Sequence, residues 1–237
     1  MTFKIDELSE QNIERLSLSY AESYCSLSKN YKTPDEMRFY TPDYFKSKVQ
    51  GMLTDKTSDI FVLSDSDNVL GFVRFSPIPE PYKKANGGGY YTESCEMCHK
   101  GVLVHWTRSA YFMPNTKLDD NTVILNQIYL HPDIQKQGVG TRFLDKVLPL
   151  IEQKYSNLIV EYNQNNKYAI SFYKGLGIRE VAKTQDLDQI TPANDYFSSV
   201  GIGYAPISVI RRHLAQKIAS DRKNILIDFH HRFRQRG

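Results

Sequence analysis

The sequence predicts one domain with a mixed α/β (α+β) fold. Segments with the 3.6-residue periodicity of helices are interspersed along the chain with short runs rich in β-branched and aromatic residues. Of the 237 residues, 41% are hydrophobic and 24% charged, which is typical of a globular protein with a single core. Both observations favour a compact arrangement in which helices cover a sheet.

The first 75 residues predict three strands and two helices. The expected elements are a strand at Phe3–Leu8, helices at Gln11–Leu27 and Pro42–Leu53, and strands at Ile60–Leu63 and Val69–Phe75. Thr41 is a suitable N-cap for the second helix, and proline costs nothing at a first helical position, where the backbone N–H lacks a partner. The polar run Asp65–Asn68 predicts a hairpin turn between the last two strands.

Residues 77–120 interrupt this regular pattern. Pro77, Pro79 and Pro81 precede the run Gly87–Gly89, and both are typical of turns and loops. Within the interruption, Val102–Phe112 predicts a further strand or two. An excursion of this length inside a domain is usually functional or disordered, so we interpret it as an insertion.

The second half returns to alternating helices and strands. The expected elements are strands at Thr122–Leu130, Leu158–Tyr162, Ile178–Lys183 and Ala205–Arg212, and helices at Thr141–Tyr155 and Asn166–Leu176. We therefore predict a domain over residues 1–212, with the insertion at about 77–120, followed by a basic C-terminal extension over residues 213–237. The alternation of Ile225, Ile227 and Phe229 with polar residues predicts an added strand, or an arm exchanged between the protomers of a homodimer.

Charge and cysteine content exclude several protein classes. A net charge of +3 is too small to indicate wholesale binding of nucleic acid, and the basic tail by itself is most simply a solvated end. The N-terminus lacks the features of a secretory signal, and no window is apolar enough to cross a bilayer. Three cysteines cannot form a disulfide framework. We expect a cytoplasmic protein, with export by a signal-less route as the alternative, and we do not expect membrane or nucleic-acid partners.

A glycine turn follows the strand Thr122–Leu130. The run Gln135-Lys136-Gln137-Gly138-Val139-Gly140 leads directly into a helix. Glycines allow a tight turn whose N–H groups point outward, and the helix adds its positive N-terminal dipole, so the turn suits a pyrophosphate. The run matches neither the dinucleotide fingerprint nor a phosphate-binding loop of the Walker type. On its own, an ordinary turn explains it equally well.

A second pattern lies at Asn166–Gly177. Asn166, Ala169, Phe172-Tyr173 and Gly177 occur at fixed offsets along a predicted helix and its cap. Asn166 and Tyr173 are two helical turns apart and therefore share a face of the helix. A capping asparagine, a core aromatic residue and a C-terminal glycine would produce the same pattern in a helix without a catalytic role.

Together the two patterns resemble the GNAT superfamily of acyl-CoA N-acyltransferases. The first is similar to its Gln/Arg-x-x-Gly-x-Gly motif and the second to its Asn-x-x-Ala-x-x-Phe-Tyr-x-x-x-Gly motif, in the family's order. The resemblance implies a mixed, largely antiparallel sheet of six to seven strands flanked by helices, with strands four and five splayed. It covers about Val123–Lys183 well and does not extend to the insertion or the tail.

The resemblance also implies a site for acetyl-CoA, with no metal. The residues implied to contact acetyl-CoA are Ile128, Tyr129, Leu130, Gln135, Lys136, Gln137, Gly138, Val139, Gly140, Thr141, Asn166 and Tyr173. Among them, Gln135–Gly140 would hold the pyrophosphate and Asn166 the pantetheine arm. Tyr173 would face the thioester sulfur.

The chemistry requires an acid and favours a base. A tyrosine hydroxyl can give a proton to a thiolate of comparable basicity at little cost, so Tyr173 fits the general acid. Ribosomal-protein alanine acetyltransferases, a GNAT branch, resemble the spacing of Glu161 before Asn166 and use that glutamate as base. A surface carboxylate on a strand is the equally weighted alternative for Glu161, and His131 is a weaker candidate for the base.

The predicted function is an N-acetyltransferase that moves the acetyl group of acetyl-CoA to a primary amine by direct attack in a ternary complex. The alternative is a non-catalytic acyl-CoA-binding module that uses its insertion and basic tail to bind a partner, and a nucleotide-dependent oxidoreductase ranks third. Cys95, Cys98, His99 and His105 lack the spacing of a zinc site. Aromatic residues of the insertion either line the acceptor pocket or anchor the insertion: Tyr90, Tyr91, Trp106, Tyr111 and Phe112. The acceptor, a small molecule or a peptide or protein, is not identified by the sequence.

Overall fold

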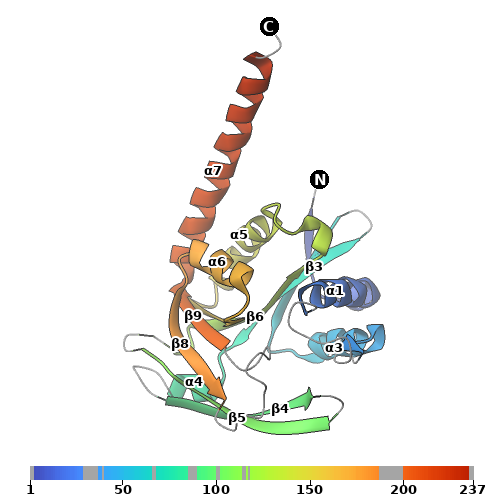
Figure 1. The fold of residues 1–237 in the computed structure, drawn as a ribbon, viewed down its shortest axis with the longest axis vertical. Coiled ribbons are helices and arrows are strands. Elements are labelled where there is room, and N and C mark those ends of the chain that lie inside the picture. The colour runs from blue at the N-terminus through green and yellow to red at the C-terminus, as the bar shows by residue number, and fades with distance from the viewer. Residues whose placement is uncertain are drawn as a thin grey trace.

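The structure is a computed structural model, and it describes residues 3–28, 37–38, 40–65, 68–84, 90–99, 102–113, 116, 118–186 and 200–234. For residues 81, 90–99, 102–109, 184–186 and 222–234 only the backbone is described. Helices lie on both sides of a long sheet, and the last helix projects from the body of the molecule (Figure 1).

The described strands form one nine-stranded sheet with the order β1-β2-β3-β6-β7-β9-β8-β5-β4. The strands are β1 (Lys4–Glu7), β2 (Asp59–Ser64), β3 (Val69–Pro77), β4 (Tyr90–His99), β5 (Val102–Tyr111), β6 (Thr122–Leu130), β7 (Asn157–Asn163), β8 (Arg179–Asp186) and β9 (Val200–Pro206). Every neighbouring pair is antiparallel except β6 and β7, which are parallel. The expected mixed, largely antiparallel sheet is confirmed, and the hairpin β4–β5 extends it at one edge.

The helices largely follow the sequence expectations. They are the short 3₁₀ helices η1 (Glu10–Asn12) and η2 (Pro132–Ile134), and the α-helices α1 (Ile13–Ser28), α3 (Pro42–Thr54), α4 (Glu80–Lys84), α5 (Val139–Ile151), α6 (Lys167–Gly175) and α7 (Ile207–Arg234). Thr41 caps α3 as predicted, because its hydroxyl accepts a hydrogen bond from the amide of Tyr44. None of the helices in the described part of the chain combines the length and the apolar character that crossing a bilayer requires.

The sheet separates two layers of buried side chains, because successive residues of a strand point to opposite faces. Leu158 of β7 packs with α5, whereas the next residue, Ile159, packs on the other side. We call the first side the α5 face, and it also carries α6 and the first turns of α7. The opposite side, the α1 face, carries α1 and α3 over β2 and β3, and α4 over β7, β8 and β9.

The expected strand at Ala205–Arg212 is wrong beyond Pro206. β9 ends at Pro206 and α7 begins at Ile207, so the segment divides between a strand and a helix. The tail is also helical, and the expected strand through Ile225 and Phe229 is wrong. Ile207 and Ile210 are three residues apart, a spacing that suits a helix that buries one face. The alternation of Ile225, Ile227 and Phe229 with polar residues indicated a strand instead, so the helix was not predicted.

The insertion contains more regular structure than the sequence suggested. α4 forms with Pro81 as its second residue, since proline is compatible with the first turn of a helix. The segment at Val102–Phe112 is β5, and it pairs with β4 over the whole length of both strands. Because β5 also pairs with β8, the insertion adds a hairpin to the sheet.

Candidate active site

The loop between η2 and α5 turns at two residues whose backbone lies in the left-handed region. Lys136 has a φ of 60°, and Gly138, the N-cap of α5, has a φ of 74°. Glycine adopts this conformation freely, whereas a side chain makes it costly. The Nε2 of Gln137 donates a hydrogen bond of 2.6 Å to the carbonyl of Asp133, which ties the loop to η2.

The backbone amides of this loop lack acceptors. From Lys136 through Thr141, no backbone N–H has a hydrogen-bond acceptor among the described residues. The amide of Arg142 donates to the carbonyl of Gly138 and begins the helical pattern. The side chains of Val139 and Thr141 are buried, so these residues can meet a ligand only through the backbone. Unpaired amides at a helix N-terminus form a site for an anion.

Charged side chains of the loop itself and of α7 lie around the loop. The Nζ of Lys136 lies 4.7 Å from the centre of the Tyr168 ring, and the Nζ of Lys217 on α7 lies 5.7 Å from the centre of the Phe172 ring. Neither lysine forms an ion pair within the described part of the chain. The carboxylate of Asp221 lies 3.7 Å from the position that a Cβ on Gly138 would occupy.

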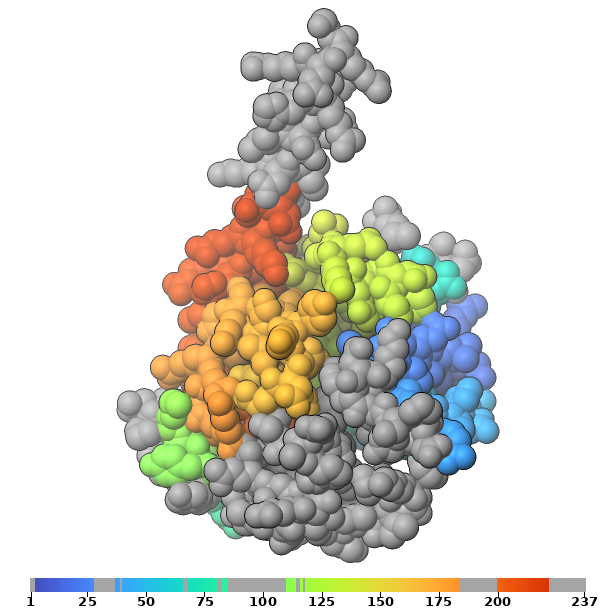
Figure 2. All heavy atoms as spheres, viewed as in Figure 1, coloured from blue at the N-terminus to red at the C-terminus, as the bar shows by residue number. Residues whose placement is uncertain are grey.

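The C-terminal helix therefore forms one wall of this region. In Figure 2 the described part of α7 (red) lies against the segment that contains α6 (orange) and beside α5 (yellow-green). The imidazole of His213 approaches Gly177 so closely that a Cβ there would lie 2.7 Å from its Cδ2. The positions of His213, Lys217 and Asp221, each four residues apart, place them along one side of α7.

β6 and β7 part beside the loop. The two strands pair only from Thr122 with Asn157 to Leu125 with Val160, and the later residues of both strands are not paired with each other. β6 continues to pair with β3 as far as Leu130, so the parting begins where β7 turns away. β6 and β7 are the fourth and fifth strands in the order of the sheet, so the splay predicted between strands four and five is confirmed.

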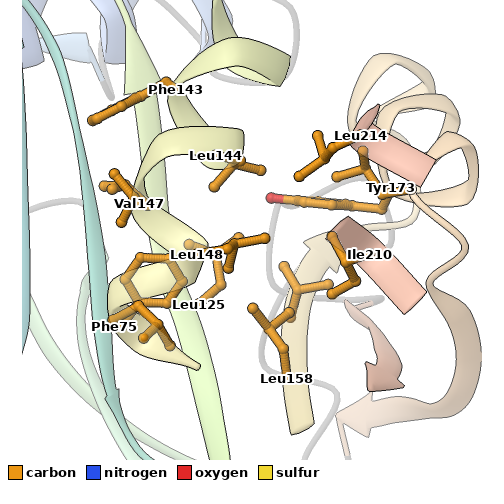
Figure 3. Close-up of a cluster of buried hydrophobic side chains, with 14 of the residues drawn as sticks. Phe75, Leu125, Phe143, Leu144, Val147, Leu148, Leu158, Tyr173, Ile210 and Leu214 are labelled. Carbon is orange, nitrogen blue, oxygen red and sulfur yellow. The ribbon is translucent and has the colours of Figure 1, made fainter. Parts of the chain in front are cut away.

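Tyr173 lies on the α5 face beside this parting. Its side chain is 7% exposed, and its ring centre lies 5.8 Å from that of Tyr162 and 5.4 Å from that of Phe172. In Figure 3 the ring extends from α6 toward α5, and its hydroxyl points in the direction of Leu144. Aromatic contacts with Tyr162 and Phe172 hold the ring in this position.

Tyr162, the neighbour of Tyr173, has a strongly shifted pKa. Burial, the negative charge of Glu180 and the hydrogen bond of 3.2 Å to that carboxylate raise the pKa of Tyr162 well above its ordinary value. Gln164 donates a further hydrogen bond of 2.7 Å to the same carboxylate oxygen. Tyr162 is therefore a protonated, structural tyrosine at neutral pH.

The other residues expected to contact acetyl-CoA fall into two groups. Gln135 and Asn166 already make local bonds: the Nε2 of Gln135 donates to the carbonyl of Leu130 at 2.8 Å, and the Oδ1 of Asn166 accepts the amide of Ala169 at 3.0 Å. Asn166 is thus the N-cap of α6. Ile128 and Leu130 pack toward the α5 face, whereas Tyr129 packs with the aromatic cluster of the α1 face.

Glu161 lies on the face opposite to Tyr173. Val160 and Tyr162 pack on the α5 face, so the side chain between them points to the α1 face. There the hydroxyl of Tyr82, a residue of α4 in the insertion that is 1% exposed, donates a hydrogen bond to the Glu161 carboxylate. The structure therefore gives this carboxylate a fixed position on the parting strand β7.

His131 is paired elsewhere. Its Nε2 lies 2.5 Å from an Oε2 of Glu22 on α1, and its backbone N–H donates to the carbonyl of Leu70. These contacts tie the end of β6 to α1 and β3. These contacts give His131 a structural role at the end of β6.

Two anchoring tyrosines escaped the sequence analysis. Tyr82 holds Glu161, and Tyr20 of α1 accepts a hydrogen bond of 2.7 Å from the Nε2 of Gln127 on β6. Both hydrogen bonds join residues far apart in the chain, and no local pattern in the sequence indicates such contacts. The role of α7 beside the loop was missed for the same reason.

The insertion residues are only partly described. Phe112 is fully buried against Tyr82, so it anchors the insertion, whereas Tyr111 is 47% exposed. The side chains of the candidates from Tyr90 to Trp106, including Cys95, Cys98, His99 and His105, lie outside the described residues. Among the residues whose side chains are described, no group of His, Cys, Asp and Glu is arranged to hold a metal ion.

Comparisons with known proteins identify this arrangement. The sequence model of the acetyltransferase (GNAT) family matches residues 21–178. No curated protein sequence matches the chain. Among solved structures, a PaiA N-acetyltransferase from Thermoplasma acidophilum in complex with coenzyme A superposes with a TM-score of 0.54 at 13% identity, over 87% of this chain and 99% of that chain.

Two further structures have the same fold. An N-acetyltransferase from Staphylococcus aureus has a TM-score of 0.56 at 13% identity, over 87% of this chain and 99% of its own. An acetyltransferase from Thermus thermophilus has a TM-score of 0.52 at 14% identity, over 87% and 97% of the two chains. With the glycine turn and the parted strands at the expected places in the fold, the match over residues 21–178 shows that the chain belongs to the GNAT family of acetyltransferases.

Proposed function

We propose that the chain is an N-acetyltransferase that transfers the acetyl group of acetyl-CoA to a primary amine by direct attack in a ternary complex. The observation that carries the proposal is the run of unpaired amides from Lys136 through Thr141, beside the parting of β6 and β7. Acceptor-free amides next to the unpaired ammonium of Lys136 suit the charge of a diphosphate. The acceptor would be a small molecule, or a peptide or protein, in the cytoplasm.

The residues present offer groups suited to the diphosphate and the pantetheine arm of coenzyme A. The loop Gln135–Thr141 would hold the diphosphate, and the Nδ2 of Asn166 would donate to the pantetheine arm, since its Oδ1 is used in capping. Backbone groups of Ile128–Leu130 would line the parting of the strands. When bound, acetyl-CoA supplies an acetyl group that is activated as a thioester.

Glu161 would receive a proton from the amine. A lysine-like amine has a pKa near 10.4, so its deprotonation at pH 7 costs roughly 4.6 kcal/mol before attack can begin. This carboxylate, held by Tyr82 on the α1 face, would accept that proton directly or through one water molecule. The acceptor would then approach from the α1 face.

Tyr173 would act from the α5 face as the general acid. As the N–C bond forms and the C–S bond breaks, its hydroxyl proton passes to the departing sulfur, and water later restores that proton. The acid and the base therefore act on the two ends of one transfer from opposite sides of the sheet. Such proton transfers typically contribute 10²- to 10⁴-fold to a rate.

Binding of coenzyme A is the first test. Calorimetry should detect binding of coenzyme A to the wild-type chain, and Gly138→Ala should weaken it, because the left-handed backbone at φ 74° is strained by a side chain. Gly51→Ala is the matched control, since Gly51 lies in α3 with nothing within 4 Å of an added Cβ. An absence of binding by folded wild-type protein would end the proposal.

Turnover is the second test. Thioester consumption should be measured with acetyl-CoA and a panel of primary amines that includes alkylamines, polyamines and peptides with free N-termini. Consumption that depends on an amine supports the enzyme. Tight binding of coenzyme A without turnover on any amine would instead favour the non-catalytic acyl-CoA-binding module.

A further inference from the structure

β6 carries a bulge where it begins to part from β7. Phe75 of β3 is opposite Leu125, but its neighbour Arg74 is opposite Gln127, so no residue of β3 stands opposite Asn126 in the strand register. A bulge of this kind changes the alternation of side chains along a strand. As a result two consecutive amide side chains of β6, those of Asn126 and Gln127, both reach groups on the α1 face.

The contacts of the two side chains confirm this direction. The Oδ1 of Asn126 accepts a hydrogen bond of 2.7 Å from the hydroxyl of Ser76, and Phe75 next to Ser76 is buried on the α5 face. The Nε2 of Gln127 donates at 2.7 Å to the hydroxyl of Tyr20, which belongs to the cluster on the α1 face.

Gln127 is left with an unsatisfied oxygen. Its Oε1 is buried, and it has no hydrogen-bond donor in the described part of the chain. Turning the amide by 180° would only exchange an unpaired acceptor for an unpaired NH₂ group. Buried polar groups in proteins are nearly always paired, so an exception at a site calls for a partner other than the described residues.

The unsatisfied oxygen and Glu161 belong to the two strands that part. Gln127 lies on β6 and Glu161 on β7, beyond the last paired residues, Leu125 and Val160, and both side chains point to the α1 face. Each is anchored by a tyrosine from an outer helix, Tyr20 for Gln127 and Tyr82 for Glu161. Each of the two parted strands thus carries an anchored hydrogen-bond acceptor on the α1 face.

We propose that the Oε1 of Gln127 binds the acceptor amine by accepting one of its N–H hydrogens while Glu161 faces another. The inference rests on the proposed function and names the group that selects the acceptor. A primary ammonium has three N–H donors and can satisfy both oxygens and still expose one hydrogen. A quaternary ammonium has the same charge and no donor, so it leaves the oxygen of Gln127 unpaired.

A titration without acetyl-CoA tests this directly. Binding of n-butylammonium to the full chain is followed by NMR shifts of the backbone amides of β6, and compared with binding of N,N,N-trimethylbutylammonium. The wild type should bind the primary ammonium more tightly, and Gln127→Met, which keeps the length of the side chain without the acceptor, should weaken that binding roughly tenfold. The affinity for the quaternary ion should stay unchanged.

Gln50→Met is the matched control, because Gln50 is an exposed residue of α3 and not a residue of β6. Three results would overturn the inference: equal affinity of Gln127→Met and wild type for n-butylammonium, equal affinity of the wild type for the two ions, or no binding of n-butylammonium. Circular dichroism verifies that each variant is folded.

Kinetics with an amine that the wild type accepts provides the second arm. Gln127→Met should raise the KM for the amine roughly tenfold and leave the Kd of coenzyme A unchanged, whereas general damage to the fold would alter both. A positive titration in a protein that neither binds coenzyme A nor consumes thioester would retain the ammonium site and discard the proposed acetyltransferase. The two failures are therefore distinguishable.

Discussion

Glu161 and Tyr173 lie on opposite faces of one sheet, although they belong to consecutive elements of the chain. β7 directs Glu161 to the α1 face, where Tyr82 holds it, and α6 directs Tyr173 to the α5 face beside Tyr162. The strands between the two faces are parted at this level. A reaction that needs an acid on one substrate and a base on the other can therefore draw them from separate layers of the molecule.

Replacing Tyr173 by Phe is expected to affect turnover more than binding. The change removes one hydroxyl from a ring held by packing, so kcat should fall by about 10²- to 10⁴-fold while the Kd of coenzyme A changes by less than about threefold. Steady-state kinetics and calorimetry measure the two quantities. Tyr162→Phe is the matched control, because this neighbouring buried tyrosine bonds to Glu180. Unchanged turnover in Tyr173→Phe would remove this residue from the acid role.

Replacing Glu161 by Gln is expected to change the dependence of the rate on pH. The fraction of neutral amine falls about tenfold for each unit of pH below its pKa, so loss of a base should matter most in acidic solution. The ratio of wild-type to variant kcat/KM should therefore rise as the pH is lowered from about 8 to about 6. A ratio that stays constant over this range argues against Glu161 as base.

Asp221 is expected to oppose the binding of coenzyme A. Its carboxylate lies beside Gly138, where the proposed diphosphate would bring like charge, so Asp221→Asn should tighten binding by roughly threefold to tenfold. The gain should shrink in high salt, which screens exposed charges. Asp145→Asn also removes one negative charge, but from a position on α5 about two turns beyond Gly138, and it serves as the control. Weaker binding by Asp221→Asn would show that the carboxylate instead assists the ligand.

Truncation tests the proposed domain boundary at residue 212. Leu214 is fully buried in the core, and His213 packs on Gly177, although both residues follow that boundary. A chain that stops after Arg212 is expected to lose about 2 to 5 kcal/mol of unfolding free energy, as when a large core side chain is deleted. A chain that stops after Asp221 should lose much less. Urea unfolding of both chains measures this, and equal stability would support the boundary at 212.

The bonds around Asp55 predict a contribution to stability that depends on pH. Hydrogen bonds from Ser58 and Thr57, with a weaker effect from Arg74 at 2.7 Å, hold the pKa of Asp55 well below its ordinary value. Because the pKa is lower in the folded state, the stabilisation is complete above the unfolded pKa of about 3.9 and is lost as the pH falls below it.

Asp55→Asn should accordingly lower the unfolding free energy by about 1 to 2 kcal/mol at pH 7. The difference from the wild type should shrink as the pH falls from about 5 to about 3. Thermal or urea unfolding across this range measures it, with Asp145→Asn as a change of charge outside this network. A difference that is independent of pH contradicts the argument.

Local patterns in the sequence were sufficient for the centre of the fold. β6 was predicted with the bounds Thr122–Leu130 that the structure shows, and α6 was expected within one residue at each end. These elements have strong apolar periodicity and clear caps, such as Asn166, so tertiary contacts agree with local preference. The glycine turn was recognised because positive φ at Gly138 has a residue-type signature.

Features that depend on distant contacts could not be predicted in this way. The bulge at Asn126 exists only in relation to the register of β3, and the anchoring of Gln127 and Glu161 depends on tyrosines from other helices. The helix that replaces the expected strand after Pro206 buries Leu214 in a core formed by earlier segments. The roles assigned to Tyr173 and Glu161 stay predictions until the variants are measured.

The short pairing of β6 with β7 has a consequence for the amount of protein present. From Thr122 to Leu125 it is the only strand ladder, within the described residues, that joins the two halves of the sheet. A ligand seated in the parting would bridge those halves, and a concentration one hundred times its Kd would add about 2.7 kcal/mol to the stability of the native state. Scarcity of coenzyme A would then lower the abundance of the protein through unfolding and degradation, in addition to starving the reaction of acetyl groups.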